Sequence, residues 1–388
     1  MLRIRVSKGS NHSPKRLLGS LGVIVGFSVS LCSLSLSLSG CGSAWVRKVD
    51  MTPDLPTELS SDMKKRFEVK ESGGAPEEAK DGSKGKPQTR GSRKSSGKNS
   101  HKNSKTHHSK SSSSNSTPSV ARIEIPSRRP LKDPLWVGEK LNFTVGYLGL
   151  SAGEFELQVK PYKYINDRKV YHLFAKVSSV GVFRLAYRAD DSVESFLDYD
   201  GIFSHKFHLE LDETKQKRDS LELYDYEKKQ TYYWDRWNHR DRGFVETKRT
   251  ETIHPFSQDM LSILYFLRTR DLPNGAEIDI PLVSEGKEWG AVCTVIRREQ
   301  IDSPMGSIQA VVVEFDKKID GVVKKTGANF LWLTDDARKI PVRIEAKVRI
   351  GAVVGRLTKV EFGTPPSAET SLQGSAVVSP DKKQSLLQ

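Results

Sequence analysis

Adjacent carboxylates are the first side chains in this sequence whose type and spacing could support catalysis. The chain carries two pairs of adjacent aspartates, Asp190-Asp191 and Asp335-Asp336. General acid–base catalysis needs two carboxylates that converge on one bond, whereas adjacent residues of a strand point to opposite faces. The Asp335-Asp336 pair is also typical of a turn in which aspartates accept hydrogen bonds from their own backbone. Neither pair therefore predicts an active site.

Histidine and cysteine residues give equally little evidence of a catalytic or metal site. His205 and His208 lie three positions apart on a predicted strand, so they should face opposite sides and not share a metal ion. Cys293 lies in the strand-like stretch Ala-Val-Cys-Thr-Val-Ile, where we expect a buried and unreactive thiol. The sequence contains no His-Glu-x-x-His and no Cys-x-x-Cys motif. We therefore predict no catalytic residue, no metal site and no cofactor.

A different cysteine lies where covalent modification is expected. Residues 1–40 begin with basic residues and continue into an apolar run, which is the layout of a secretory signal peptide. The run ends in Leu38-Ser39-Gly40-Cys41, which resembles the lipobox of bacterial lipoproteins. That resemblance implies cleavage before Cys41, with a diacylglycerol on its thiol and fatty acyl chains such as palmitate. The alternative is an uncleaved membrane-spanning helix over residues 17–40, but the serines of its second half weaken it.

Residues 41–119 are predicted to form a disordered linker. The tract 73–117 is rich in Lys, Ser, Gly, Asn and His residues, which cannot bury enough apolar surface to fold. Within the linker, one short helix is expected around Ser60–Val69. Two interpretations of the tract remain open. It is either a soluble tether or a basic arm whose lysines bind an anionic polymer of the cell envelope.

The basic excess of the whole chain belongs to these first segments. Lys and Arg number 62 in the chain, against 48 Asp and Glu. From Leu131 to Gln388 the basic and acidic residues are equal in number, so the folded part carries no net basic charge. We therefore expect no binding of nucleic acid.

Residues 120–363 carry the pattern of a β domain. Apolar and polar residues alternate there in about a dozen short runs, most regularly over residues 340–350. Glycine-bounded turns such as Gly149–Gly153 separate the runs, and no spacing typical of a βαβ unit appears. We therefore predict an all-β antiparallel domain, followed by a disordered tail over residues 364–388.

One segment of this domain, residues 259–268, is predicted to be helical. It is apolar around most of its circumference, including Met260, Leu261, Leu264 and Leu267, so it must be buried. A sheet with few helices must pack against another sheet or curl on itself. We predict a large curved antiparallel sheet that forms a wide or incomplete barrel around this helix. A two-sheet sandwich is the alternative.

Three stretches of the domain resemble the bacterial family called domain of unknown function 3108 (DUF3108). They are the hairpin from Gly138-Glu139-Lys140-Leu141 to Gly153, the helix at 259–268, and Trp332-Leu333-Thr334-Asp335-Asp336-Ala337-Arg338-Lys339-Ile340-Pro341-Val342. The resemblance spans about Leu135 to Phe362. It implies an exported, mostly β domain and no established activity.

An aromatic group with basic neighbours is the candidate surface for a ligand or partner. Its members are Tyr232, Tyr233, Trp234, Trp237 and Arg236. Such rings and guanidinium groups could stack on a sugar or bind a peptide. Cross-strand packing near a strand end explains the same residues equally well, and the two interpretations stay open.

These observations favour a non-enzymatic lipoprotein of the bacterial cell envelope. We expect it to be anchored to a membrane by lipid, and Gly42 after the acylated cysteine points by resemblance to the outer membrane, facing the periplasm. The preferred function is a β-scaffold that binds a hydrophobic ligand such as an acyl chain. The alternative is a structural or assembly lipoprotein with a protein or peptidoglycan partner, and an envelope hydrolase is a weaker third.

Overall fold

Strands make up most of the described chain. The computed structural model describes residues 59–71, 125–319, 322–324, 329–348 and 351–366. These residues form one 16-stranded sheet whose neighbouring strands pair antiparallel. The predicted all-β class and antiparallel pairing are therefore confirmed.

The three described helices are α2 (Ser61–Arg66), α3 (Gly181–Ala186) and α4 (Ser262–Arg268). The strands, in chain order, are β1 (Lys70–Glu71), β2 (Val137–Tyr147), β3 (Leu150–Ile165), β4 (Arg168–Ser179), β5 (Asp190–Asp198), β6 (Ser204–Asp212), β7 (Gln216–Asp225), β8 (Gln230–His239), β9 (Gly243–Thr252), β10 (Glu277–Ser284), β11 (Lys287–Ser303), β12 (Gly306–Ile319), β13 (Val322–Lys324), β14 (Asn329–Thr334), β15 (Pro341–Lys347) and β16 (Ala352–Thr364).

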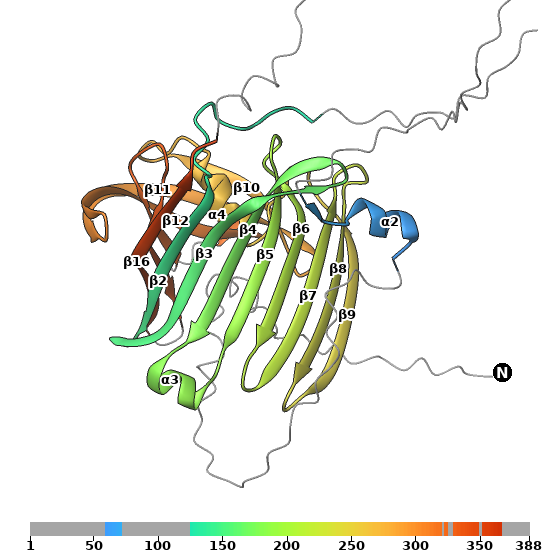
Figure 1. The fold of residues 1–388 in the computed structure, drawn as a ribbon, viewed down its shortest axis with the longest axis horizontal. Helices are drawn as coiled ribbons and strands as arrows, with labels where there is room; N and C mark the ends of the chain where they lie inside the picture. Colours follow the sequence, from blue (N-terminus) through green and yellow to red (C-terminus); the bar gives the residue numbers. More distant parts are fainter. Residues whose placement is uncertain (1–58, 72–124, 320–321, 325–328, 349–350, 367–388) are drawn as a thin grey trace, which may run out of the picture. The chain divides into compact units, whose positions relative to one another are not determined.

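The strands follow one another as a long meander. β2 to β9 pair in sequence, β10 to β16 form a second run, and β16 returns to pair with β2. Figure 1 shows the first run in green and yellow and the second in orange and red. The alternation of side chains places one face of each run in the core, as with Leu141, Phe143 and Val145 of β2.

The sheet does not close into a continuous barrel. β9 and β10 are its two ends, and no ladder joins them among the described residues. Instead, the turn between β10 and β11 approaches β9, where Arg249 donates a hydrogen bond of 2.7 Å to the carbonyl of Glu285. The next residue, Gly286, has φ +67°, and a Cβ there would lie 2.9 Å from the Cβ atoms of Arg249 and Tyr233. Glycine is therefore required for this close approach.

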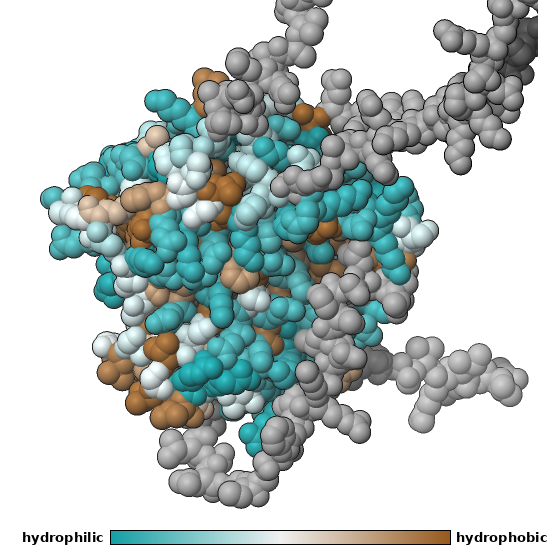
Figure 2. All heavy atoms as spheres, viewed as in Figure 1, coloured by the Kyte–Doolittle hydropathy of each residue, from teal (hydrophilic) through white to brown (hydrophobic). Residues whose placement is uncertain are grey.

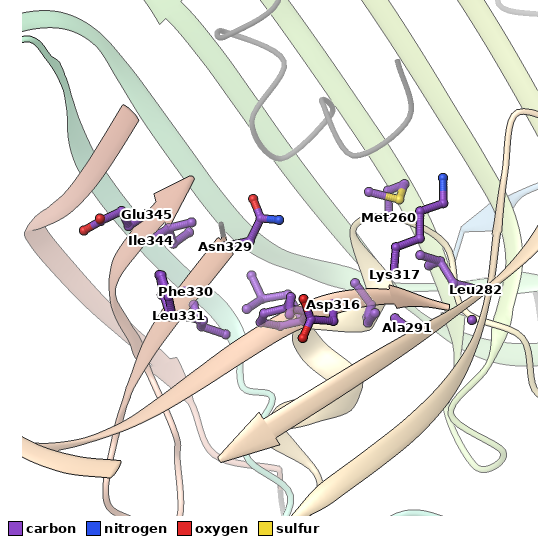
Figure 3. Close-up of a pocket in the computed structure, with 14 residues that line it drawn as sticks. Met260, Leu282, Ala291, Asp316, Lys317, Asn329, Phe330, Leu331, Ile344 and Glu345 are labelled. Carbon is purple, nitrogen blue, oxygen red and sulfur yellow. The ribbon is translucent and has the colours of Figure 1, made fainter. Parts of the chain in front are cut away.

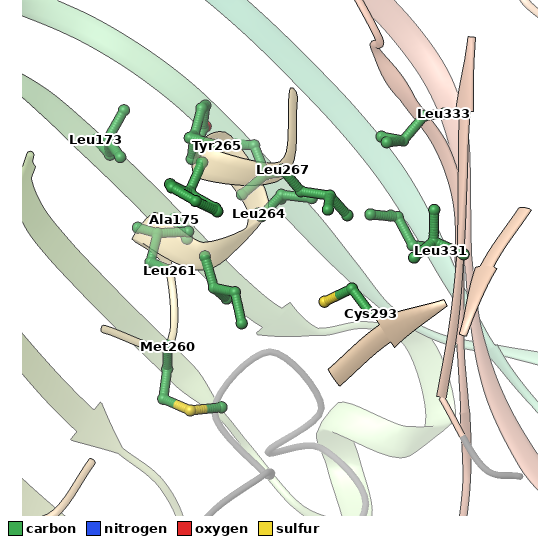
Figure 4. Close-up of a cluster of buried hydrophobic side chains, with 14 of the residues drawn as sticks. Leu173, Ala175, Met260, Leu261, Leu264, Tyr265, Leu267, Cys293, Leu331 and Leu333 are labelled. Carbon is green, nitrogen blue, oxygen red and sulfur yellow. The ribbon is translucent and has the colours of Figure 1, made fainter. Parts of the chain in front are cut away.

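Helix α4 lies between the two runs of the sheet. Figure 4 shows it with Leu173 and Ala175 of β4 on one side and Leu331 and Leu333 of β14 on the other. The predicted helical residues Met260, Leu261, Leu264 and Leu267 are all buried. The prediction of a curved, incomplete barrel around one buried helix is confirmed.

The helix begins later than predicted. Met260 and Leu261 form a turn, and regular helix starts at Ser262. The carboxylate of Asp259 accepts hydrogen bonds from the backbone N–H groups of Leu261 and Ser262, at 2.8 and 2.7 Å. These bonds satisfy amide groups at the start of the helix that have no partner within it.

Helix α2 packs on the outer face of the sheet. Its Met63, together with Leu59 and Phe67, forms a separate buried cluster with side chains of β4, β5 and β7. Arg66 donates two hydrogen bonds of 3.0 Å to the buried carboxylate of Asp225. The helix expected within Ser60–Val69 is confirmed. The linker prediction is corrected over 59–71, because these apolar side chains find a surface to bury against, and the rest of 41–119 lies outside the described residues.

Exposed apolar side chains gather at the end of the sheet that carries α3. They are Leu148 and Leu150 of the β2–β3 hairpin and Val182 and Leu185 of α3. Figure 2 shows hydrophobic residues gathered at this lower left end. No helix within the described ranges has both the length and the hydropathy to cross a bilayer. The lipobox, Cys41 and the 364–388 tail, apart from residues 364–366, lie outside those ranges.

Candidate functional site

The C-terminal end of α4 is fixed by a buried cluster of charges. Arg268 donates hydrogen bonds of 2.6 and 2.8 Å to the two carboxylate oxygens of Glu139 on β2. Arg338, in the turn between β14 and β15, donates to the same carboxylate, and its guanidinium lies 3.6 Å from the ring centre of Trp136. One acid thus holds two arginines that arrive from different segments.

The N-terminal end of α4 is fixed by a buried polar cluster. Asp259 is fully buried, and its Oδ2 accepts hydrogen bonds of 2.6 Å from the hydroxyls of Ser195 and Ser204. Ser204 in turn lies 2.8 Å from the hydroxyl of Ser262. Burial raises the pKa of the Asp259 carboxyl, although these hydrogen bonds act in the opposite direction. Both ends of the helix are therefore held by polar contacts to the sheet.

Between these two ends, α4 forms one wall of an apolar cavity. The cavity has a volume of about 80 Å³ and is partly open to solvent. The opposite wall comes from β10, β11, β12, β14 and β15. The lining residues are Met260, Ile263, Leu264, Leu282, Gly290, Ala291, Phe315, Asp316, Lys317, Asn329, Phe330, Leu331, Ile344 and Glu345 (Figure 3). Sequence reasoning identified only the helix side of this cavity.

The chemistry of the cavity is that of an apolar binding site. Its exposed inner surface is almost entirely carbon. Among the lining residues, Lys317 places its ammonium group 3.3 Å from the ring centre of Trp289, and burial lowers the pKa of this lysine. Glu345 pairs with Arg343 at 2.5 Å. The described side chains around the cavity offer no histidine, serine or free thiol that could serve as a nucleophile.

The volume sets what the cavity can hold. An engineered apolar cavity of about 150 Å³ stays dry and binds benzene, so roughly half that volume suits a smaller apolar group. A polar ligand would lose its hydrogen bonds to water here without replacement. The end of an alkyl chain, with the rest of the molecule outside, matches both the size and the apolar wall.

The predicted aromatic surface is divided between two faces of β8. Tyr233 is buried on the inner face, whereas Tyr232 and Trp234 pack against the cluster that α2 covers. On the inner face, the indole N–H of Trp237 donates a hydrogen bond of 2.8 Å to Gln216. Arg236 pairs with Asp219. The chain's own α2 segment thus packs beside Tyr232 and Trp234, two residues of the group for which a ligand surface was one of two interpretations.

The two carboxylates of the Asp190-Asp191 pair have different partners. Asp190 pairs with Arg184 and Arg188 at 2.9 Å, and these arginines hold the pKa of its carboxyl at about 2. Asp191 faces Glu213 instead, and burial together with the Glu213 charge raises the pKa of Asp191 to about 8. Sequence reasoning missed this Asp191–Glu213 contact because Asp191 lies on β5 and Glu213 lies in the connection between β6 and β7.

Local hydrogen bonds also account for the second acid pair and for His205 and His208. Asp336 accepts hydrogen bonds of 2.9 Å from the backbone N–H groups of Arg338 and Lys339, as expected for a turn. His205 contacts Asp198 and His208 contacts Asp219, each at 2.8 Å. The histidines therefore have separate partners. No group of His, Cys, Asp and Glu suited to a metal ion occurs in the part of the chain that the structure describes.

One catalytic pattern does occur in the sequence. Gly149-Leu150-Ser151-Ala152-Gly153 matches Gly-x-Ser-x-Gly, which in serine hydrolases places the serine on a turn between a strand and a helix. Here the stretch lies at the β2–β3 hairpin, where Ser151 is exposed. No hydrogen bond joins Ser151 to a histidine within the described ranges. The pattern therefore lacks the geometry of a nucleophile.

The family described as protein of unknown function (DUF3108) matches residues 142–358. This range contains α4, most of the sheet and all of the cavity-lining residues. No curated protein matches the chain.

Solved structures with weak similarity to the chain include the following three. A β-barrel-like protein of domain of unknown function DUF1849 from Brucella abortus has a TM-score of 0.36 at 11% identity, covering 58% of this chain and 98% of its own. A Bacteroides fragilis protein described as exported, with a YmcC-like fold, has a TM-score of 0.27 at 8% identity, with 59% and 98% covered. A protein from Parabacteroides distasonis described as a lipoprotein has a TM-score of 0.26 at 8% identity, with 62% and 100% covered.

Proposed function

Because the chain belongs to the DUF3108 family, whose function is unknown, we propose its function from the site itself: it is a non-catalytic binding protein that holds the end of an acyl chain beside α4. The observation that carries this proposal is the apolar cavity between α4 and β10 to β15. A barrel interior is normally filled by its own side chains. A partly open apolar space next to a buried helix is therefore suited to a ligand.

The polar contacts at both ends of α4 support this proposal. Asp259 and Arg268 hold the helix to the sheet at its two ends. Their contacts leave Met260, Ile263 and Leu264 between them as a fixed apolar wall. A preformed wall lowers the ordering that a ligand must cause on binding, which favours affinity.

The cellular setting of the proposed function comes from the N-terminal sequence. A lipid on Cys41 would tether the domain to a membrane of the cell envelope, and the outer membrane facing the periplasm is the proposed location. The basic linker would then lie near anionic envelope polymer. Replacing Cys41 with alanine should release the protein into the soluble fraction, whereas an uncleaved helix over 17–40 would keep the variant in the membrane.

A titration with a fluorescent fatty acid tests the binding function. The substitution Ala291→Leu adds an isopropyl group inside the cavity, and Ala276→Leu adds the same group at a half-exposed position that does not line it. We expect the unsubstituted protein and Ala276→Leu to bind the probe alike, and Ala291→Leu to lose about tenfold or more in affinity. Equal binding by all three proteins would exclude the cavity as the site.

A further inference from the structure

Two arginines lie side by side just beyond the C-terminal end of α4. Arg128 belongs to the segment that leads into β2, and Arg270 follows α4 by two residues. The guanidinium of Arg270 lies 4.3 Å from the ring centre of Phe266. That of Arg128 lies 5.8 Å from the same ring and 4.2 Å from the ring of Phe256. The two cations therefore share one aromatic neighbour.

Both arginines have buried N–H groups without a partner. Nη1 of Arg128 and both Nε and Nη2 of Arg270 are shielded from solvent and make no hydrogen bond. Neither guanidinium forms an ion pair within the described ranges. Arg268, two residues earlier, differs, because its guanidinium is fully paired with Glu139 and backbone carbonyls. Buried polar groups are hydrogen-bonded in the great majority of cases, so these donors indicate a missing acceptor.

The charges around the pair also favour an anion. Burial and the charge of Arg270 lower the pKa of Arg128, and only Tyr226 acts against them. Burial also lowers the pKa of Arg270, and only Asp271 acts in the opposite direction. An oxyanion between the two guanidinium groups would offset the repulsion between their charges. It would also replace hydrogen bonds to water that burial has taken from them.

The rings that hold Arg128 form a built platform. Phe256 packs against Phe203 and Tyr226, with ring centres 5.8 and 5.3 Å away. The backbone of Phe256 has φ +64°, which a bulky residue rarely adopts. Backbone strain of this kind is retained where the surrounding structure requires it and is frequent at ligand sites.

We propose that Arg128 and Arg270 form a binding site for a phosphate group. Guanidinium groups bind phosphate oxygens through paired N–H donors, and the three unpaired nitrogens here match an oxyanion with several acceptor atoms. The site is separate from the acyl cavity, whose lining includes neither arginine nor either ring. The phosphate belongs either to a free molecule or to a lipid headgroup.

Thermal unfolding of the full chain tests the site with inorganic phosphate, using sodium chloride of equal ionic strength as the reference. The variants are Arg128→Gln and Arg270→Gln. Arg240→Gln is the matched control, because it removes one positive charge at an exposed position. We expect phosphate to raise the melting temperature of the unsubstituted protein and of Arg240→Gln, and to leave both site variants unchanged. Without phosphate, the site variants should melt at the same or a higher temperature, because each removes a repulsive charge.

A second arm distinguishes the two sources of the phosphate. Flotation with phosphatidylcholine vesicles that contain phosphatidic acid reports headgroup binding, and the basic linker contributes equally in all variants. If Arg128→Gln and Arg270→Gln lose flotation, and inorganic phosphate does not raise the melting temperature of the unsubstituted protein, the site binds a lipid headgroup. If phosphate shifts all four proteins alike, or if neither phosphate nor vesicles separate the site variants from the control, the proposal is wrong.

Discussion

Glu139 of β2 and Arg268 of α4 form a bidentate ion pair, with N–O distances of 2.6 and 2.8 Å, and neither side chain is exposed by more than 1%. The pair joins the first strand of the domain to its one fully buried helix across 129 positions of sequence. Arg338 donates to the same carboxylate from the β14–β15 turn. The position of α4, and with it the wall of the acyl cavity, therefore depends on Glu139.

We predict that Glu139→Gln destabilises the domain by about 3–5 kcal/mol, because it leaves the buried charge of Arg268 without a counter-charge. Urea unfolding followed by circular dichroism measures this change. Glu361→Gln is the control, since Glu361 pairs with Lys359 on the surface and its loss should leave the midpoint unchanged. A shift as small for Glu139→Gln as for the control would contradict the role given to the pair.

The three stretches that resemble DUF3108 in the sequence meet at this ion pair. Glu139 lies in the first stretch, Arg268 ends the second and Arg338 lies in the third. The sequence predicted the sheet, its antiparallel pairing and the burial of α4, because alternation and helical apolarity are local patterns. It did not predict the meeting of the three charged residues, because contacts between distant positions leave no periodic pattern.

The site itself was predicted only on its helix side. Met260 and Leu264 follow from the apolar helix, whereas Ala291, Phe315 and Leu331 line the cavity through the register in which β11, β12 and β14 pair. The packing of α2 was also missed. Its spacing of Leu59, Met63 and Phe67, four residues apart, is the pattern of a short apolar helix face and could have indicated it.

A second prediction concerns pH. Glu222 is buried on the inner face of β7, where it accepts hydrogen bonds of 3.0 Å from Thr231 and from the backbone of Gly286. Burial, aided by the charges of Asp259 and Glu285, raises the pKa of Glu222 from 4.5 to about 8. Because the native state then binds the proton more tightly than the unfolded state, stability should fall as pH rises from about 4.5 to 8.

The substitution Glu222→Gln isolates this effect from other titrating groups such as Asp191. We expect the free energy of unfolding of the unsubstituted protein to fall by up to about 1.4 kcal/mol for each pH unit in this window, and Glu222→Gln to lack this fall. The variant should be more stable than the unsubstituted protein at pH 9. Glu227→Gln, at a more exposed position of the following turn, should keep the full slope. Parallel stability curves for Glu222→Gln and the unsubstituted protein would show that Glu222 is charged in both states.

The buried thiol provides a third prediction. Cys293 has no exposed surface, and burial together with the charges of Asp279 and Asp316 raises its pKa. In a chain that starts at residue 42, Cys293 is the only cysteine, and it should not react with a thiol reagent at pH 8 until the protein unfolds. Ser307→Cys adds an exposed thiol that should react at once. Rapid labelling of Cys293 in the native protein would rule out the packing described for β11.

Helix α2 leads to a fourth prediction, which trypsin can test. Its sequence contains Lys64, Lys65 and Arg66, which should resist cleavage while Met63 holds the helix on the sheet. Met63→Ala removes a buried side chain and should speed cleavage at these positions by about tenfold or more. Glu68→Gln changes an exposed residue and should leave the rate unchanged. Equal rates in both variants would mean that α2 does not depend on this cluster.

A crystal structure with a terminally brominated fatty acid shows whether the cavity beside α4 holds the end of an acyl chain. We expect one anomalous bromine peak between Leu264 of α4 and Ala291 of β11, and no such peak in crystals of Ala291→Leu. A bromine peak elsewhere on the protein would contradict binding in the cavity. The same holds if the protein binds the acid in solution and its crystals show no bromine peak.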